Sequence, residues 1–328
     1  MEREAMFYEK LEGNRVKCNL CHHYCQLSPG QKGLCLNKIN KDGKLYSAQY
    51  GKIITIASDP IEKKPLYHYY PGSEILSVAQ AGCNLKCPFC QNAEISQEEV
   101  PAYKELSPEE LKNLITGNNA DMIAFTYTEP LMWYEYIYDF CQVKGDIKTV
   151  IVSNGNINRK PAETIAPLID AANIDMKSTD SDFYAGELGG DLNSVKNTIE
   201  IFHDNDVHVE ITILIIPGKT DNEEQFKELT DFIAGISPFI PLHISRYYPS
   251  YKYNAPPTPI DTLTRLYDIA KKTLHYAYIG NIPDREYTST YCHNCGNLLI
   301  ERSIYNVQTP GLENGRCSKC NTPLRAQL

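Results

Sequence analysis

The 328-residue sequence lacks several features that define broad classes of protein. No run approaches the roughly 18 consecutive apolar residues that a membrane span needs. The first residues, Met1-Glu2-Arg3-Glu4-Ala5, lack the apolar core of a signal peptide, so we expect a cytoplasmic protein. Basic residues are also fewer than acidic ones, with 32 lysines and arginines and 41 aspartates and glutamates. The net charge of −9 argues against broad electrostatic binding of nucleic acid, although it is compatible with a local basic pocket.

What the sequence does contain is an ordinary globular composition and an excess of cysteine. The chain is long enough for one large domain and one or two small ones. Of its 12 cysteines, 11 fall into three clusters. Clustered spacing in a reducing compartment indicates metal sites before disulfides. The twelfth, Cys141, follows an aromatic segment and is predicted to be a buried structural thiol.

The central cluster has the spacing C-x3-C-x2-C and consists of Cys83, Cys87 and Cys90. A β-like run at 74–79 precedes it, so we expect the thiols on a loop at the carboxyl end of a strand. Thiolates are soft ligands suited to iron–sulfur clusters or zinc. Three are one fewer than a structural zinc or an ordinary [4Fe–4S] cluster takes, so an iron held here keeps an open position. The alternatives are a zinc knuckle with a distant fourth ligand and buried free thiols.

This loop resembles the signature of the radical S-adenosylmethionine (SAM) superfamily, C-x3-C-x-aromatic-C, with Phe89 as the aromatic residue. The resemblance implies a [4Fe–4S] cluster whose unligated iron is chelated by the amino and carboxylate groups of SAM. It also implies that one electron from the cluster cleaves SAM to methionine and a 5′-deoxyadenosyl radical, which abstracts hydrogen from a substrate. The protein contributes binding, orientation and the exclusion of water to such chemistry.

The first 40 residues hold a second cluster with the spacing C-x2-C-x3-C-x9-C. A segment this short buries little apolar core, so a bound metal is a sensible source of stability. Four thiolates would close a structural zinc site, and a second iron–sulfur cluster is equally compatible with the ligand type; no metal is the third alternative. His22 and His23 are interpreted as loop polarity, because neither is needed as a ligand. The four cysteines are Cys18, Cys21, Cys25 and Cys35.

The last 40 residues form a separate unit with two C-x2-C knuckles. This pattern is typical of rubredoxin-like and zinc-ribbon modules. Four thiolates form a closed tetrahedral site with no room for substrate, and we expect zinc, with iron as the alternative. An iron site could pass electrons, whereas zinc could not. The ligands are Cys292, Cys295, Cys317 and Cys320.

Strand-like and helix-like runs alternate from residue 74 onward. The strands are apolar along their length, as strands buried on both faces must be, and six βα repeats predict a parallel sheet. We therefore expect an α/β fold: a radical SAM partial (β/α)6 TIM-like barrel at 71–285, an N-terminal four-cysteine module with a β-hairpin at 1–70, and a rubredoxin-like zinc ribbon at 286–328. Strands are predicted at 75–79, 122–127, 149–153, 172–176, 209–216 and 241–247, and helices at 107–117, 130–142, 161–170, 192–205, 222–235 and 258–273.

Two segments precede the predicted barrel. Residues 44–58 alternate in β fashion around Gly51 and are predicted to form a hairpin. Residues 62–72 are rich in ionisable and aromatic side chains. We interpret them as a connector, with a position over the active site as the alternative.

Polar residues follow the predicted strands, where functional groups of parallel barrels gather. After the second strand, Glu129-Pro130 matches the family's Gly-Gly-Glu-Pro motif, although Tyr127-Thr128 replaces the two glycines. The resemblance implies that Glu129 receives the amino group of SAM; the alternative is a helix start that needs no ligand. After the third strand, Ser153 and Asn154 resemble the family's Thr-Asn-Gly and would face the SAM ribose or carboxylate.

The later strands resemble those of glycyl-radical-enzyme activases. Asp175-Met176-Lys177 is similar to an Asp-Leu-Lys motif whose Asp and Lys contact SAM; an exposed ion pair is the alternative. Thr212 stands where the activases carry an arginine, so that contact is expected to be lost or altered. His243 falls where they place a histidine near SAM, and the alternative is a core histidine. Glu210 lies on an apolar strand and needs a partner, because buried charge is costly.

Almost the whole chain resembles the radical SAM member of the AmmeMemoRadiSam systems, which is related to pyruvate formate-lyase activating enzymes. The resemblance implies a cluster, SAM and association with Memo-type and AMMECR-type proteins, together with a reductant such as flavodoxin or ferredoxin. One hypothesis is a radical enzyme acting on a small molecule or a modification substrate. The second is an activase that installs a glycyl radical on a partner protein. The third is a non-enzymatic interaction module that is stabilised by bound metal. The motifs that carry the resemblance are Cys18 to Cys35, Glu62 to His68, Gly82 to Asn92, Phe125 to Pro130 and the terminal ribbon.

Overall fold

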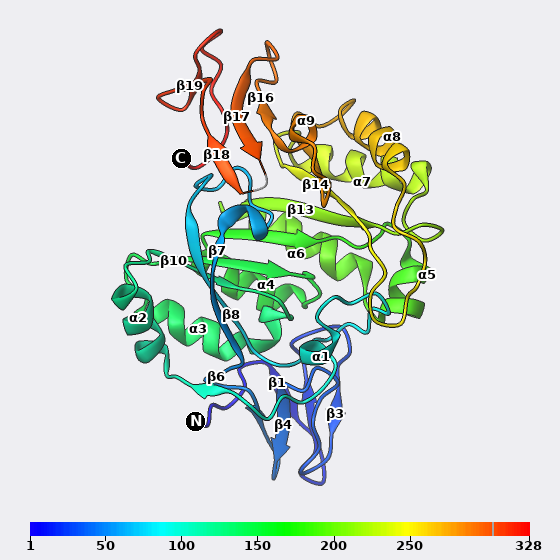
Figure 1. Ribbon diagram of the computed structural model, residues 1–328. Helices are drawn as coiled ribbons and strands as arrows, with labels where there is room; N and C mark the ends of the chain where they lie inside the picture. The colour runs from blue at the N-terminus through cyan, green and yellow to red at the C-terminus, as the bar shows by residue number, and fades with distance from the viewer. Residues whose placement is uncertain (304) are drawn as a thin grey trace.

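The computed structural model describes residues 1–303 and 305–328. Its centre is an eight-stranded sheet, in which seven strands run parallel and follow one another in chain order (Figure 1). An eighth strand, β7, pairs antiparallel with β8 at one edge, and β15 forms the other edge, so the sheet is open. This confirms the predicted α/β fold with a parallel sheet. The strands are β7 (Thr55–Pro60), β8 (Glu74–Ala79), β10 (Met122–Phe125), β11 (Lys148–Ser153), β12 (Ala171–Asp175), β13 (His208–Ile215), β14 (Leu242–Arg246) and β15 (Ala277–Gly280).

Helices connect the parallel strands, and their bounds lie close to the predicted ones. Local sequence explains the start of α2, where Ser107 and Glu110 form a reciprocal capping box. The Glu110 amide donates to Ser107 Oγ at 3.2 Å, and the Ser107 amide donates to the Glu110 carboxylate at 2.7 Å. The helices are α1 (Ala93–Ser96), α2 (Pro108–Gly117), α3 (Tyr134–Val143), α4 (Arg159–Ile165), α5 (Ser181–Phe183), α6 (Leu192–Asp204), α7 (Glu223–Ile236), α8 (Ile260–Ala270) and α9 (Arg285–Thr288).

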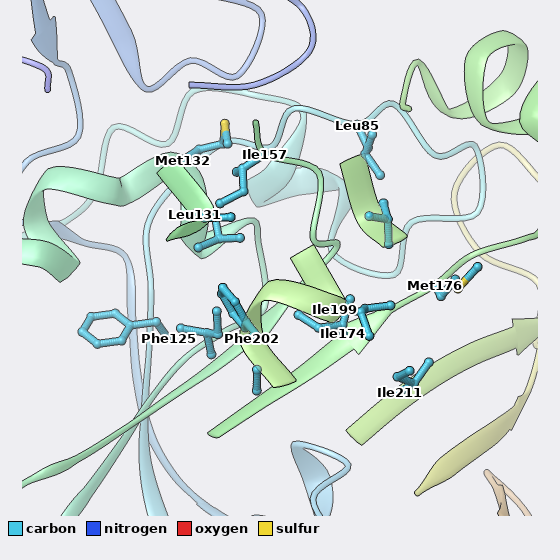
Figure 2. Close-up of a cluster of buried hydrophobic side chains, with 14 of the residues drawn as sticks. Leu85, Phe125, Leu131, Met132, Ile157, Ile174, Met176, Ile199, Phe202 and Ile211 are labelled. Carbon is cyan, nitrogen blue, oxygen red and sulfur yellow. The ribbon is translucent and has the colours of Figure 1, made fainter. Parts of the chain in front are cut away.

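The largest hydrophobic core lies between the sheet and these helices. In Figure 2, Ile199 and Phe202 of α6 lie beside side chains of the sheet that include Phe125 and Ile174. Leu85, from the central cysteine loop, belongs to the same core and is 1% exposed. The loop that carries the central cysteines is therefore anchored by apolar packing.

Residues 61–70 cover the opposite face of the sheet. Leu76 and Ile123 belong to the core on the helix side, whereas Ile75 and Met122 pack with Leu66 in a separate cluster. Because successive strand residues point to opposite faces, the two clusters lie on the two faces of the sheet. The segment interpreted as a connector is therefore a buried part of the core.

Two predictions about strands differ from the structure. The hairpin expected over 44–58 is wrong, because β7 pairs with β8 across the buried segment. The true hairpin lies upstream and joins β4 to β5 through Asp42-Gly43, both of which have positive φ, as tight two-residue hairpin turns require. The seventh parallel strand, β15, was not predicted and pairs with β14 at the edge of the sheet.

The two cysteine-rich ends of the chain lie at opposite ends of the molecule in Figure 1, with the central sheet between them. Among the described residues, no helix combines the length and the apolar character of a membrane span. The N-terminal strands are β1 (Tyr8–Lys10), β2 (Val16–Cys18), β3 (Gln26–Leu27), β4 (Lys38–Lys41), β5 (Lys44–Ser47) and β6 (Lys52–Ile53), which pairs with β9 (Lys104–Glu105). The C-terminal strands are β16 (Thr290–Tyr291), β17 (Leu298–Ser303), β18 (Asn306–Gln308), β19 (Leu312–Glu313) and β20 (Arg316–Cys317).

Candidate active site and metal centres

A cavity of about 640 Å³ lies where the parallel strands end. It receives the three thiols of the loop after β8 and polar groups that follow β10, β11 and β12. Parallel strands place their carboxyl ends at one edge of a sheet, which is why residues far apart in the chain meet here. The residues that sequence analysis proposed and that line this cavity are Cys83, Cys87, Phe89, Cys90, Glu129, Ser153, Asn154, Asp175 and Lys177.

The chemistry of the three thiols fits a metal cluster. Burial raises the pKa of Cys83 well above its usual value and that of Cys87 to about 11. Buried thiols of this kind lose their protons when a metal coordinates them. The amide of Leu85 donates to Cys83 Sγ at 3.4 Å, and Asn154 Nδ2 donates to the same atom at 3.6 Å, so hydrogen bonds are in place for a thiolate. Three soft ligands that face an open cavity suit a cluster with one free coordination position.

Glu129 joins the loops after β10 and β11. Its Oε1 accepts from Ser153 Oγ at 2.7 Å and from the Leu131 amide at 3.0 Å, and its Oε2 accepts from the Asn154 amide at 2.8 Å. The side chain is 1% exposed, and burial raises the pKa of Glu129 to about 7 despite these donors. A carboxylate offers about four acceptor positions, so room for a ligand donor remains.

Asp175 and Lys177 follow β12 and form an ion pair, with 3.1 Å between Lys177 Nζ and Asp175 Oδ2. Burial disfavours the charged lysine, but Asp175 and Cys87 outweigh this and raise the pKa of Lys177 above its usual value. The pair lines the cavity beside the cysteine loop. A fixed positive charge and a fixed negative charge are therefore available to a zwitterionic ligand.

Comparison with known proteins assigns the family. Residues 77–233, which span the cysteine loop and the strand ends described above, match the Radical SAM superfamily. These residues form a radical SAM domain. This family implies a [4Fe–4S] cluster and SAM, and the cavity presents the three thiols such a cluster needs.

Three relatives show how far the similarity extends. The uncharacterized protein MJ0808 of Methanocaldococcus jannaschii is 41% identical, and the alignment covers 97% of each chain. The 7-carboxy-7-deazaguanine synthase of Methanothermobacter thermautotrophicus is 29% identical over 45% of this chain and 58% of its own. The pyruvate formate-lyase-activating enzyme of Clostridium pasteurianum is 27% identical over 47% of this chain and 67% of its own. The last two alignments cover less than half of this chain.

Tyr127 shows how this chain departs from the family's two glycines. Its φ of +69° lies in the left-handed region, which glycine adopts easily and an aromatic residue rarely does. Contacts with the segment before β8 hold it there: the Tyr127 hydroxyl donates to the Asp59 carboxylate, and Lys64 Nζ lies 4.5 Å from the ring centroid. Lys64 Nζ also lies 2.6 Å from Asp59 Oδ2. The strained loop is therefore supported by a buried polar network.

Several cavity residues were missed by sequence reasoning. They include the ionisable segment before β8, for which a position over the active site was only the second interpretation. That segment's density of charged and aromatic residues was the available signal. The missed residues that line the cavity include Lys63, Lys64, Pro65, Tyr127, Ser245, Asn281 and Tyr305.

His243 is placed apart from the other predicted SAM contacts. Its Nε2 lies 2.6 Å from Glu210 Oε2, its side chain is 3% exposed, and it does not line the cavity. Glu210 is buried and also lies 3.0 Å from His208 Nε2 and accepts from the amides of Tyr67 and His68. Burial raises the pKa of Glu210, but the two histidines outweigh it and hold the pKa well below the usual range. Glu210 is thus paired with two histidines, as a buried carboxylate requires. The position of His243 fits the alternative of a core histidine.

The C-terminal cysteines form a compact group. The sulfur atoms of Cys292 and Cys320 lie 3.6 Å apart, as do those of Cys295 and Cys317, and all four fall within 4.8 Å of one another. Zinc–sulfur bonds of about 2.3 Å place tetrahedral thiolates at this kind of spacing. The four residues can therefore hold one metal ion, either zinc or iron.

Proposed function

We propose that this protein reductively cleaves SAM and uses the resulting 5′-deoxyadenosyl radical to abstract hydrogen from a substrate. One observation carries the proposal: three thiols and the polar groups of three further strand ends line a single cavity. When bound, the cluster supplies the electron that divides SAM into methionine and the radical. The buried walls exclude water from a species that would otherwise be quenched.

The proposed roles of the side chains follow from their chemistry. Cys83, Cys87 and Cys90 would hold the cluster and would leave one coordination position open for SAM. Glu129 accepts a hydrogen bond from the amino group of SAM, since its carboxylate faces the cavity and is already oriented by three donors. The polar groups of Ser153 and Asn154 line the wall proposed for the ribose or carboxylate, and the pair of Asp175 and Lys177 orients the remaining polar atoms of SAM.

The direct test is anaerobic reconstitution followed by dithionite and SAM. We expect 5′-deoxyadenosine and methionine to form in equal amounts, and only when protein, cluster, reductant and SAM are all present. Chromatography of quenched reactions measures both products. A fully loaded protein that binds SAM yet forms no 5′-deoxyadenosine, with or without extract of its native host, would contradict the proposal.

A second candidate function is activation of a glycyl-radical enzyme. It is favoured by the similarity to a pyruvate formate-lyase-activating enzyme and by Asp175, Lys177 and the Pro217-Gly218 ending after β13. Extract of the native host, grown on glycine deuterated at its α-carbon and separated into protein and small-molecule fractions, distinguishes the two functions. Deuterium in 5′-deoxyadenosine from the protein fraction alone supports the activase, whereas turnover with the small-molecule fraction alone rules it out.

The proposed partners come from the family resemblance. Membership of an AmmeMemoRadiSam system would make Memo-type and AMMECR-type proteins the first candidates to test for binding or for stimulated SAM cleavage. Flavodoxin or ferredoxin is the proposed electron donor. The cavity offers Lys63, Tyr127 and Tyr305 in addition to the proposed SAM contacts, so the substrate has polar and aromatic groups to bind.

Lowering the pH should weaken SAM binding through Glu129. Its pKa is about 7 before SAM binds, so at pH 6 most carboxyls carry a proton that must leave before they can accept from SAM. We expect the Kd to rise by about tenfold between pH 8 and pH 6, since each unit below the pKa costs about a factor of ten. Equilibrium dialysis of the cluster-loaded protein under anaerobic conditions measures it.

The matched control is Glu129→Gln, which cannot titrate. SAM itself titrates equally in both proteins, so only the difference between their pH profiles reports on Glu129. We expect the variant to bind SAM more weakly at pH 8 and to lose the extra pH dependence. Parallel profiles for the two proteins would show that Glu129 does not contact SAM.

A further inference from the structure

The four N-terminal cysteines surround a second cavity that SAM cleavage, as proposed above, does not use. They approach it from the end of β2, from the turn that follows and from the loop before β4. The rest of the wall is largely apolar and includes Leu20, Leu34 and Met132. All four thiols therefore face one small enclosed space. The four are Cys18, Cys21, Cys25 and Cys35.

The spacing of these thiols differs from that of the C-terminal group. Four ligands of a single ion must lie close together, as Cys292, Cys295, Cys317 and Cys320 do. Among the residues that the structure describes, no three of the N-terminal thiols lie within 4.8 Å of one another. The three thiols of the radical SAM loop share this wider spacing. Thiolates that bind different irons of a cluster are farther apart than thiolates on one ion.

We propose that the N-terminal cysteines bind a second [4Fe–4S] cluster rather than zinc. The spacing of the thiols is the observation that favours a cluster, because it is wider than the spacing of the C-terminal group that fits a single ion. Lys38 lines the same cavity, with its Nζ 2.6 Å from Glu135 Oε2 and 3.1 Å from the Met132 carbonyl oxygen. The positive charge of Lys38 is therefore held beside four thiols that would become negatively charged thiolates on binding a cluster.

The two cysteine loops are in direct contact. A Cβ atom on Gly82 would lie 2.1 Å from the carbonyl oxygen of Cys35, so the two backbones meet at the residue before Cys83. Asn37 Nδ2 donates to the carbonyl oxygens of Cys35 and of Ala81, each at 3.0 Å. The second cluster would therefore sit beside the first.

Both histidines between the N-terminal cysteines strengthen this contact. His23 Nε2 lies 2.8 Å from the carbonyl oxygen of Asn84, next to Cys83, and His22 Nε2 lies 3.0 Å from that of Gly189. Their interpretation as loop polarity was therefore incomplete, because they connect the N-terminal loop to Gly189 and to the cysteine loop after β8. Resting on the proposed function, the inferred role is electron relay. A donor of the flavodoxin or ferredoxin class reduces the second cluster by one electron, which passes to the first cluster and returns the second to its oxidised state.

The first experiment removes the radical SAM cluster. The triple variant Cys83→Ala/Cys87→Ala/Cys90→Ala, reconstituted anaerobically with iron and sulfide, should retain about four irons and four acid-labile sulfides per chain. Adding Cys21→Ser and Cys25→Ser should remove both. The sulfide content distinguishes an N-terminal cluster from a single iron in the C-terminal group, because a rubredoxin-like iron site contains no acid-labile sulfide. Zinc near two per chain with no sulfide would overturn the proposal.

Two features keep this test independent of other failures. Should the triple variant not fold, the wild-type protein still distinguishes about eight irons and eight sulfides from about four of each. The iron and sulfide contents do not depend on SAM cleavage. They therefore test the second cluster independently of the proposed function. Electron paramagnetic resonance of the reduced wild type tests contact between the clusters: mutual broadening supports the relay, and a simple sum of the two single-cluster spectra overturns it.

Discussion

Replacing Cys87 with alanine should abolish SAM cleavage while leaving the C-terminal module folded and metal-loaded. Cys87 is one of three thiols for the proposed catalytic cluster, and two thiolates from one short loop cannot hold it. We expect 5′-deoxyadenosine to fall to the level seen without protein. Chromatographic assay with dithionite measures activity, and metal analysis measures what the C-terminal cysteines retain. Continued cleavage would show that these three cysteines do not carry the cluster.

The matched control is Cys141→Ala. Cys141 lies on α3 and belongs to none of the three clusters, and its sulfur makes two long contacts, 3.5 Å to the Leu168 carbonyl oxygen and 4.0 Å to Thr149 Oγ1. Its removal should leave iron content and SAM cleavage at wild-type levels. Equal losses in the two variants would mean that the assay reports general damage to the protein rather than loss of a cluster ligand.

The repeating part of this molecule was predictable because its signals are local. Apolar runs predicted the six strands from β8 to β14, and the parallel arrangement then placed Glu129, Ser153 and Asp175 at one edge of the sheet. Short cysteine spacings likewise predicted three metal centres, and the C-terminal four-cysteine group is compact enough to hold one ion. In each case a few neighbouring residues contain the information, and the topology of a parallel sheet brings the pieces together.

The missed features depend on contacts between distant parts of the chain. The hydrogen bond from Tyr127 to Asp59 joins residues 68 positions apart. The burial of 61–70 depends on strands whose residues follow this segment in the sequence. His243 shows the same limit. Its position along β14 suggested a contact with SAM. In the structure, its Nε2 instead pairs with Glu210 on the neighbouring strand β13. Pairing partners of this kind leave no periodic pattern in the sequence.

Arg302 explains how the C-terminal module is joined to the wall of the active site. Its guanidinium is fully buried, donates to the Tyr67 carbonyl oxygen at 2.5 Å, and lies 3.6 Å from the Glu62 carboxylate. Tyr67 and Glu62 belong to the segment that supplies Lys63 and Lys64 to the cavity. The ribbon thus stabilises a part of the chain that shapes the site, whatever metal it holds.

Arg302→Met should lower the free energy of unfolding by about 3–5 kcal/mol, the usual cost of leaving one partner of a buried ion pair without the other. Glu62 would then be a buried carboxylate whose remaining donor is the Gly72 amide, at 2.9 Å. Adding Glu62→Gln should restore part of the loss, because it removes the stranded charge and keeps an acceptor for Gly72. Urea unfolding followed by the fluorescence of Trp133, the single tryptophan, measures all three proteins.

Arg285→Met is the control for this prediction, because it removes the same side chain from the same region. Arg285 pairs with Glu301 at 3.4 Å, but its side chain is 66% exposed. Water and salt screen such a pair, so the loss should stay below about 1 kcal/mol. Similar losses in Arg302→Met and Arg285→Met would mean that the buried pair does not fasten the ribbon to the barrel. A large loss at Arg302 with no recovery on adding Glu62→Gln would assign the effect to the bonds with Tyr67 and its neighbours rather than to the charge of Glu62.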